Sequence, residues 1–333
     1  MNVLRLHGAH DVQLHQEPMP VPKTDEQLLR VTAVGVCGSD LHWFAESGIG
    51  DARLSRPLVL GHEFAGVVDS GPHRGQRVAV DPAIPCEQCE FCLEGHPNLC
   101  ANIHFAGHGS DDGALREYMA WPERNFYPIP GTFTDADGVM LEPLGVAIHA
   151  VDLGHLRPGM TVGVFGCGPI GLLIAQLARA AGATRVFGTD VLPHRLEAAR
   201  SFGAVALAAD GQEAKAIMAA THKRGVDVAF EVAGVNAAVE TAIAAVKPGG
   251  AVVLVGIPSD DSTAFTASIA RRKGLTIRMS RRMKRTYPRA IALVENELID
   301  VRSIVTHQFP LTEAVKAFET AHRREGLKII LKP

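Results

Sequence analysis

Hydrophobic and polar positions follow two different patterns along the chain, and the change comes near residue 145. Before it, short segments of alternating apolar and polar residues lie between clusters of Gly, Pro and His, as in 28–36 (LLRVTAVGV) and 75–82 (GQRVAVDP). Such alternation over about four to eight residues is typical of strands with one buried face. The first part of the chain is therefore expected to be an all-β region of short strands.

After residue 145, apolar runs alternate with amphipathic segments. The runs with the length of buried parallel strands are 160–166, 184–190, 226–234, 249–256 and 275–280. The segments with helical periodicity between them are 169–183, 194–204 and 236–250. This alternation predicts a doubly wound parallel sheet. A further helix is expected within 286–298 and a terminal strand at 327–331.

Composition adds bounds to this picture. The 333 residues exceed the size at which one hydrophobic core keeps growing, so we expect two domains, 1–144 with 284–333 and 145–283. The formal net charge of −3 argues against a general nucleic-acid binder. The first eighteen residues contain no apolar run of signal-peptide length, and no later stretch is long enough to span a bilayer. A cytoplasmic protein without a membrane partner is therefore expected.

Four cysteines lie in one short segment, CEQCEFCLEGHPNLC, at Cys86, Cys89, Cys92 and Cys100. Their close spacing lets one loop direct four sulfur atoms to a common centre, and zinc is the metal that four thiolates usually bind. The alternatives are a pair of disulfides and an iron–sulfur cluster. We favour zinc because intracellular cysteine clusters are more often metal sites and no electron-transfer cofactor is indicated. Four thiolates leave no open coordination position, so this zinc is expected to be structural.

A glycine-rich turn joins the first apolar strand of the second half to a helix. Gly166, Gly168 and Gly171 have the G-x-G-x-x-G spacing that brings a pyrophosphate to a helix N-terminus, and Cys167 between them is interpreted as a small packing residue. Asp190 closes the next strand, where an acidic side chain accepts both ribose hydroxyls of NAD and repels the extra phosphate of NADP. We therefore expect NAD as the cofactor. The alternative for Asp190 is a helix cap at a strand end.

A second metal site is indicated by Cys37 in GVCGSDLH, His62 and Glu63 in GHEFAG, and Glu142 in EPLGVAIHA. A thiolate, an imidazole and a carboxylate around an open position are donors typical of a catalytic zinc. Counting charges favours one direct carboxylate, although which glutamate binds directly stays open. Because neighbours on a flat strand point to opposite faces, His62 and Glu63 reach one metal only if Gly61 or a bend interrupts the strand.

These motifs, with DDGALREY (111–118), GCGPIG (166–171) and SRRM (280–283), resemble the zinc-dependent medium-chain dehydrogenases, and within them the sorbitol (polyol) dehydrogenase branch. The resemblance runs nearly end to end. It implies an α/β fold in which a GroES-like β-rich catalytic domain carries two zincs, one catalytic and one structural, and a Rossmann domain binds NAD. It also implies an enzyme that transfers a hydride from a polyol or related secondary alcohol to NAD, giving a ketone.

The resemblance further implies roles for individual residues. Cys37, His62 and Glu63 match the direct metal ligands of the family, and Glu142 matches a residue that usually reaches the metal through a water. Ser39 and His42 match residues of a proton relay that runs through the nicotinamide ribose. The alternatives are a turn hydrogen bond for Ser39 and a surface imidazole for His42. The expected substrate contacts are Ser39, Glu142 and Arg282. The expected cofactor contacts are Gly166, Gly168, Pro169, Ile170, Gly171, Asp190, Arg195, Gly256, Ile257 and Arg281.

A basic segment departs from the family pattern. Residues 271–285, RRKGLTIRMSRRMKR, contain eight Lys or Arg. Such a run is usually a solvated face, but Arg282 matches an arginine that contacts the polyol in the sorbitol branch, and Arg281, Lys284 and Arg285 surround it. One hypothesis is that the substrate carries an acid or phosphate group, such as an aldonate or a polyol phosphate, because arginine binds such anions well.

Other interpretations stay open at this point. Threonine or a simple alcohol could replace the polyol as substrate. A zinc-poor NAD-binding regulatory protein is the non-enzyme alternative, and it predicts at most the structural zinc. Otherwise the expected partners are a small-molecule substrate and a second copy of the chain, in a homodimer or homotetramer.

Overall fold

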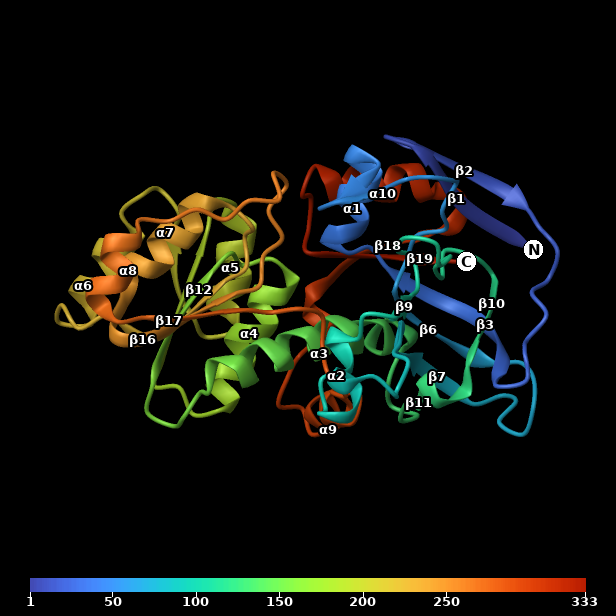
Figure 1. Ribbon diagram of the computed structural model, residues 1–333, viewed down its shortest axis with the longest axis horizontal. Helices are drawn as coiled ribbons and strands as arrows, with labels where there is room; N and C mark the ends of the chain where they lie inside the picture. The colour runs from blue at the N-terminus through green and yellow to red at the C-terminus, as the bar shows by residue number, and fades with distance from the viewer. The chain divides into compact units, whose positions relative to one another are not determined.

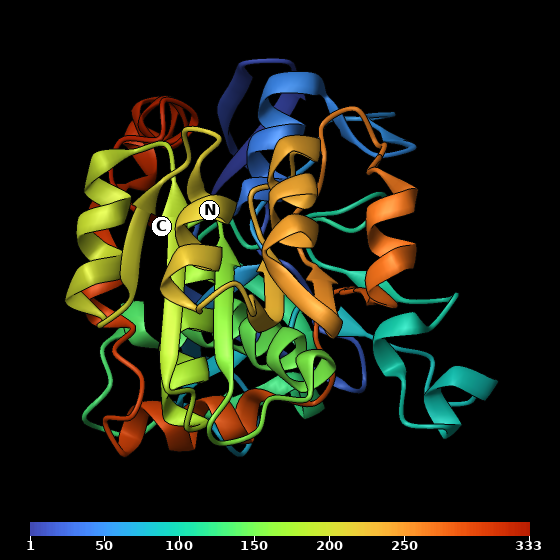
Figure 2. The same ribbon diagram turned by 90° about the vertical axis from the view of Figure 1, so that its left-hand side faces the viewer.

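The computed structural model describes residues 1–333, which divide into two compact units, each built on a sheet (Figure 1, Figure 2). The first unit consists of residues 1–143, 287–295 and 301–333, and the second of residues 144–286 and 296–300. The expected α/β class, with a β-rich part and a parallel-sheet part, is confirmed. No helix has both the length and the apolar content that a membrane span requires.

The first unit has a seven-stranded sheet whose neighbours are antiparallel except for β18 with β19. At its centre β3 (Glu26–Gly35) lies between β6 (Glu63–Val68) and β19 (Lys328–Lys332), so the last strand of the chain pairs with one of the first (Figure 1). The other strands are β7 (Arg77–Val80), β10 (Tyr118–Pro122), β11 (Phe126–Pro128) and β18 (Val305–Pro310).

Small sheets and helices surround this sheet. Helix α1 (Gly38–Glu46) contacts both β1 (Asn2–Gly8) and α10 (Ala314–His322) (Figure 1). These contacts bring together segments from the two ends of the chain. The remaining small strands are β2 (Asp11–Gln16), β4 (Gly48–Ile49), β5 (Ala52–Arg53), β8 (Ala83–Ile84) and β9 (His104–Phe105). The other helices and helical turns are α2 (Glu90–Leu93), α9 (Tyr287–Glu295), η1 (Pro97–Leu99), η2 (Glu123–Asn125), η3 (Arg302–Ile304) and η4 (Leu311–Glu313). Helix α3 (Asp135–Gly154) contributes residues to both units.

The second unit has a six-stranded, fully parallel sheet in the order β14-β13-β12-β15-β16-β17. The first strand in sequence is therefore central, and the order reverses next to it, which is where α/β sheets bind ligands. The strands are β12 (Thr161–Phe165), β13 (Arg185–Asp190), β14 (Val205–Ala208), β15 (Val226–Glu231), β16 (Val246–Leu254) and β17 (Thr276–Met279). The helices are α4 (Pro169–Ala180), α5 (Pro193–Ser201), α6 (Glu213–Ala220), α7 (Asn236–Ala245) and α8 (Ala267–Lys273).

Two local expectations need correction in this unit. The helix expected over 236–250 ends at Ala245, and β16 begins at Val246. Pro248 explains the early end, because a proline disfavours helical backbone in the residue before it. Strand β14 was not predicted, since its four residues, VALA, are too short to show a period.

Residues 296–300 belong to the second unit because hydrogen bonds fasten them to α4. The Gln176 side chain donates to the carbonyl oxygen of Asp300 (3.0 Å) and accepts from its amide (2.8 Å). These partners are 124 residues apart in sequence, so no local pattern could have indicated the contact.

Candidate metal and cofactor sites

Cys37, His62 and Glu63 converge in the first unit, with one donor atom of each within 4.8 Å of the others. Cys37 follows β3 and is the N-cap of α1, while Glu63 opens the neighbouring strand β6. His62 and Glu63 are buried. A thiolate, an imidazole and a carboxylate this close together are a donor set that suits zinc.

The local backbone explains how two adjacent residues face one centre. Gly61 has a φ of +94°, a conformation that favours glycine, and β6 begins only at Glu63. The chain therefore turns just before the strand, and His62 is outside the alternation of β6. This turn is the interruption of the strand that His62 and Glu63 need in order to face one metal.

Asp40 supports this group and was not predicted from the sequence. Its Oδ2 accepts a hydrogen bond from the Cys37 amide (2.9 Å), and its Oδ1 lies 3.5 Å from His62 Nδ1. Burial alone would lower the pKa of His62, but Asp40 and Cys37 raise that pKa well above its usual value. The surroundings of His62 thus favour positive charge, as expected of a cation site.

A buried lysine, also not predicted, lies against the same group. Lys328 Nζ donates to both carboxylate oxygens of Glu63, at 2.6 and 2.8 Å. Burial lowers the pKa of Lys328, but the charges of Glu63 and Cys37 outweigh burial and raise it. The signal in the sequence was a single lysine at the start of the apolar strand KIIL, because a lysine buried in a strand needs a partner.

Glu142 lies on α3 and is not part of the three-residue group. Burial raises its pKa to about 8, with Glu63 adding to the shift while His62 and Lys328 oppose it. Glu142 therefore shares the electrostatic environment of the group without supplying one of its three donor atoms.

The four cysteines of 86–100 form a second group, with their sulfur atoms within 4.8 Å of one another. All six cysteines of the chain are free thiols, so the structure contains no disulfide. The backbone N–H groups of Gln88 and Cys89 lower the pKa of Cys86 to about 6, and the Cys86 amide donates to Cys100 Sγ (3.3 Å). Burial and the neighbouring cysteines raise the pKa of Cys92 to about 12, so the amides favour the thiolate form at Cys86 and not at all four sulfur atoms.

The predicted relay residues lie on α1, next to the Cys37 group. Ser39 is two residues beyond Cys37 in the first turn of this helix, and His42 lies one turn later. His42 Nδ1 is 3.4 Å from Glu46 Oε1, and the His42 side chain is largely shielded from solvent. Glu46 therefore orients the imidazole, and it was not singled out in the sequence.

In the second unit the glycine-rich turn connects β12 to α4. Gly166 has a φ of +110°, and a Cβ there would lie 2.8 Å from the amide nitrogen of Ala233, so only glycine fits. Gly168 is the N-cap of α4 and Pro169 its first residue, so the helix N-terminus opens directly at the turn. Burial raises the pKa of Cys167 to about 12, consistent with a packing role.

Asp190 ends β13 and its carboxylate organises this turn. Oδ2 accepts from the Cys167 amide (2.8 Å), and Oδ1 accepts from the Leu192 amide (3.0 Å). Arg195 Nη1 lies 3.6 Å from Oδ2. The expected acidic residue thus lies beside the glycine-rich turn, with the expected arginine next to it.

Apolar side chains are exposed where three strands end. Val191 follows β13, Val235 follows the end of β15, and Ile257 follows β16; their exposed fractions are 65%, 50% and 50%. Exposed apolar residues at the carboxyl edge of a parallel sheet are suited to the flat faces of a bound dinucleotide. Ile257 was predicted as a cofactor contact, whereas Val191 and Val235 were not. The position of Val191, directly after the strand that Asp190 ends, was a usable signal in the sequence.

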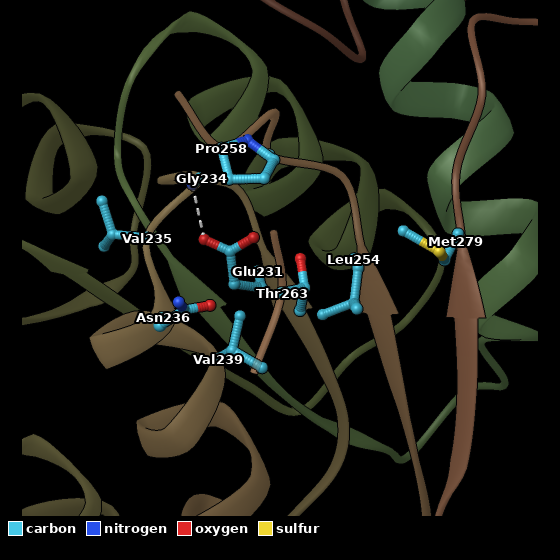
Figure 3. Close-up of a pocket in the computed structure, with 10 residues that line it drawn as sticks. Glu231, Gly234, Val235, Asn236, Val239, Leu254, Pro258, Thr263 and Met279 are labelled. Carbon is cyan, nitrogen blue, oxygen red and sulfur yellow. Dashed lines mark hydrogen bonds between the residues drawn. The ribbon is translucent and has the colours of Figure 1, made fainter. Parts of the chain in front are cut away.

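A small pocket lies at the same edge, around the buried carboxylate of Glu231 (Figure 3). Glu231 Oε1 accepts from the amides of Ala233 (2.8 Å) and Gly234 (2.7 Å), and burial raises the pKa of this carboxyl group. A Cβ at Gly256 would lie 2.8 Å from Glu231 Oε2. Glu231 therefore fixes the loops after β15 and β16, including the predicted Gly256.

The basic segment 271–285 is not one continuous feature. Lys273 donates to the carbonyl oxygens of Ile243, Ala244 and Val246 (2.7 to 2.9 Å), so it satisfies the end of α7. Arg281 is exposed, and Arg282 has a φ of +52° after β17. Part of the basic run is therefore structural.

Comparisons with known proteins match the two units separately and the chain as a whole. The family "Alcohol dehydrogenase GroES-like domain" matches residues 23–131, and "Zinc-binding dehydrogenase" matches residues 169–296. The sorbitol dehydrogenase of Bacillus subtilis (strain 168) is 35% identical over 343 residues, covering 100% of this chain and 97% of the relative.

Solved structures agree with these matches. L-idonate 5-dehydrogenase from Escherichia coli K-12 superposes with a TM-score of 0.93 at 28% identity, over 100% of this chain and 98% of that one. A short chain alcohol dehydrogenase from Escherichia coli CFT073, in complex with NADH, gives a TM-score of 0.92 at 27% identity, over 100% and 99%.

Proposed function

The chain belongs to the zinc-binding dehydrogenases, in the branch of the sorbitol dehydrogenases, and we propose that it oxidises a polyol or related secondary alcohol to a ketone with NAD. The observation that carries this proposal is the convergence of Cys37, His62 and Glu63 in a chain that also has a dinucleotide-type turn at Asp190. The metal group and the turn supply the two components of zinc-assisted hydride transfer.

Zinc is proposed to bind Cys37, His62 and Glu63 directly, with Glu142 reaching it through a water. One thiolate and one carboxylate neutralise a divalent cation, whereas a second direct carboxylate would oppose ionisation of the substrate hydroxyl. The exclusion of Glu142 from the three-residue group supports this choice. Zinc at the four-cysteine group is proposed to be structural.

When bound, zinc supplies Lewis acidity at the substrate hydroxyl, and NAD supplies the hydride acceptor. The chain supplies the proton route. Ser39, in the first turn of α1, is proposed to accept the hydroxyl proton through its Oγ, and His42, one turn later, to act as the base that releases the proton toward solvent. Glu46 holds His42 Nδ1, which leaves Nε2 for the transfer toward solvent.

NAD is proposed to bind along the edge formed by β12, β13, β15 and β16. The residues proposed to contact it are Gly166, Gly168, Pro169, Ile170, Gly171, Asp190, Arg195, Gly256, Ile257 and Arg281. The negative charge of Asp190 favours NAD over NADP. The neighbour solved with NADH supports the choice of cofactor.

The substrate is proposed to be a neutral polyol, since the relatives matched over the whole chain include a sorbitol dehydrogenase. A sugar acid or polyol phosphate is the second candidate. It is supported by the basic residues Arg281, Arg282 and Lys284 and by the similarity to L-idonate 5-dehydrogenase.

NAD reduction across a panel of neutral polyols, aldonates and polyol phosphates tests this proposal. We expect turnover with a neutral polyol. We also expect Arg281→Ala and Lys284→Ala to keep the ratio of kcat/KM for neutral over anionic substrates within about twofold of the wild-type ratio, because these charges would not contact a neutral substrate. Turnover confined to anionic substrates, or a ratio that rises about tenfold or more in either variant, would favour the second candidate.

A homodimer or homotetramer is proposed for the assembly. Strand β17 is at the edge of the parallel sheet, and Met279 on it is 73% exposed, so a second copy could pair there. Light scattering of the purified protein distinguishes one, two and four chains.

A further inference from the structure

A buried cation lies against one of the proposed metal ligands. The side chains of Lys328 and Glu63 are only 3% and 1% exposed, and Lys328 is the one lysine or arginine among the buried residues of the chain. Besides its two hydrogen bonds to Glu63, Lys328 Nζ donates to the carbonyl oxygen of Val36 (3.1 Å). An ammonium group has three donors, so its hydrogen bonding is complete.

The position of Lys328 connects the segments that carry two ligands. Val36 immediately precedes Cys37, and Glu63 opens β6 on the other side of β3 from β19. One ammonium group therefore joins the segment bearing Cys37 to the strand bearing Glu63.

Charge explains why a lysine is suited to this place. The buried carboxylates of Asp40 and Glu63 lie close to the half-buried thiol of Cys37. His62 lies against Asp40, and Lys328 is the cation in contact with Glu63. A buried carboxylate without a counter-charge is strongly unfavourable, so Glu63 requires a cation when no metal is bound. A carboxylate accepts about four hydrogen bonds, so Glu63 can face Lys328 and a metal at once.

We propose that Lys328 is an internal counter-ion that holds Glu63 in its ligand position before the metal arrives and then shares that carboxylate with the metal. This inference rests on the zinc site of the proposed function. The ammonium repels a divalent cation and competes for the Glu63 oxygens. The site is therefore preformed but binds zinc less tightly than the same ligands would without the lysine.

A purely structural lysine predicts the opposite change in zinc affinity. If Lys328 only joined strands, its removal would loosen the ligands and weaken zinc binding. As a counter-ion, its removal destabilises the metal-free protein but strengthens zinc binding. The sign of the change in Kd therefore separates the two roles.

Lys328→Met tests the proposal, because methionine has a similar length and no charge. Lys332→Met, at an exposed position of the same strand, is the matched control. For both variants, two quantities are measured. One is the melting temperature of the metal-free protein. The other is the Kd of the zinc proposed at Cys37, His62 and Glu63, obtained by competition with a chromophoric chelator. We expect Lys328→Met to lower the melting temperature and to lower Kd about tenfold or more, and Lys332→Met to change neither. An unchanged or raised Kd in Lys328→Met overturns the proposal.

Two further measurements keep the test decisive if Lys328→Met folds only with metal. In the zinc-loaded variant, a chelator should remove the zinc of the Cys37, His62 and Glu63 site more slowly than it does from the wild type. Equal or faster removal contradicts the proposal. Lys328→Met combined with Glu63→Gln removes both charges and should recover the melting temperature of the metal-free protein, whereas no recovery also overturns it. A wild-type chain that takes up only one zinc would instead refute the proposed metal site, and the inference with it.

Discussion

Cys37→Ser is expected to lower the zinc content from two per chain to one and kcat/KM for polyol oxidation by about 1000-fold or more. Cys37 supplies the one thiolate of its group, and a neutral hydroxyl is a much weaker zinc ligand. Losing the metal removes about 4 kcal/mol or more of transition-state stabilisation, and about 1.4 kcal/mol corresponds to a factor of ten in rate. Metal analysis and initial rates of NAD reduction check both parts.

Cys92→Ser is the comparison for this variant, because it removes a thiolate from the four-cysteine group. It should lower the zinc content by the same amount but reduce kcat/KM far less than Cys37→Ser does. An equal loss of turnover in the two variants would contradict the assignment of catalysis to the Cys37 group.

Asp190→Ser is expected to lower the ratio of kcat/KM for NAD over NADP by about 100-fold or more. The carboxylate would accept the two ribose hydroxyls of NAD and repel the phosphate of NADP. Charge-assisted hydrogen bonds are worth about 1.5–3 kcal/mol each, so losing two accounts for a change of this size. Steady-state kinetics with both cofactors measures the ratio.

The control for Asp190→Ser is Asp210→Ser. Asp210 follows the neighbouring strand β14, is exposed, and accepts a hydrogen bond from the Gln212 amide. This variant should keep the wild-type ratio. An unchanged ratio in Asp190→Ser would show that the carboxylate only supports the turn through the Cys167 and Leu192 amides.

The sequence was most informative where function depends on local spacing. The four cysteines span fifteen residues, and the glycine-rich turn requires only a strand before it and a helix after it. The requirement for a bend at Gly61 followed from strand geometry alone. These features could be predicted because the residues that form them are neighbours in the chain.

The residues that were missed act through long-range contacts. Lys328 is 265 positions from Glu63, and its position became known only from the pairing of β19 with β3. Asp40 was visible in CGSDLH, but nothing in that segment shows that its carboxylate lies between Cys37 and His62. The periodicity of apolar residues indicates which face of a helix or strand is buried. The residues that a side chain contacts depend on the order of the strands in the sheet, which one sequence does not determine.

The most direct test of the central claim is NAD reduction with a neutral polyol before zinc removal, after removal by a chelator and after zinc is returned. We expect two zincs per chain in the active protein, loss of turnover when the zinc proposed at Cys37, His62 and Glu63 is removed, and recovery when zinc is restored. Turnover that persists without zinc would contradict the account. The account would also be contradicted if the protein held two zincs per chain but no polyol, aldonate or polyol phosphate of the panel supported NAD reduction.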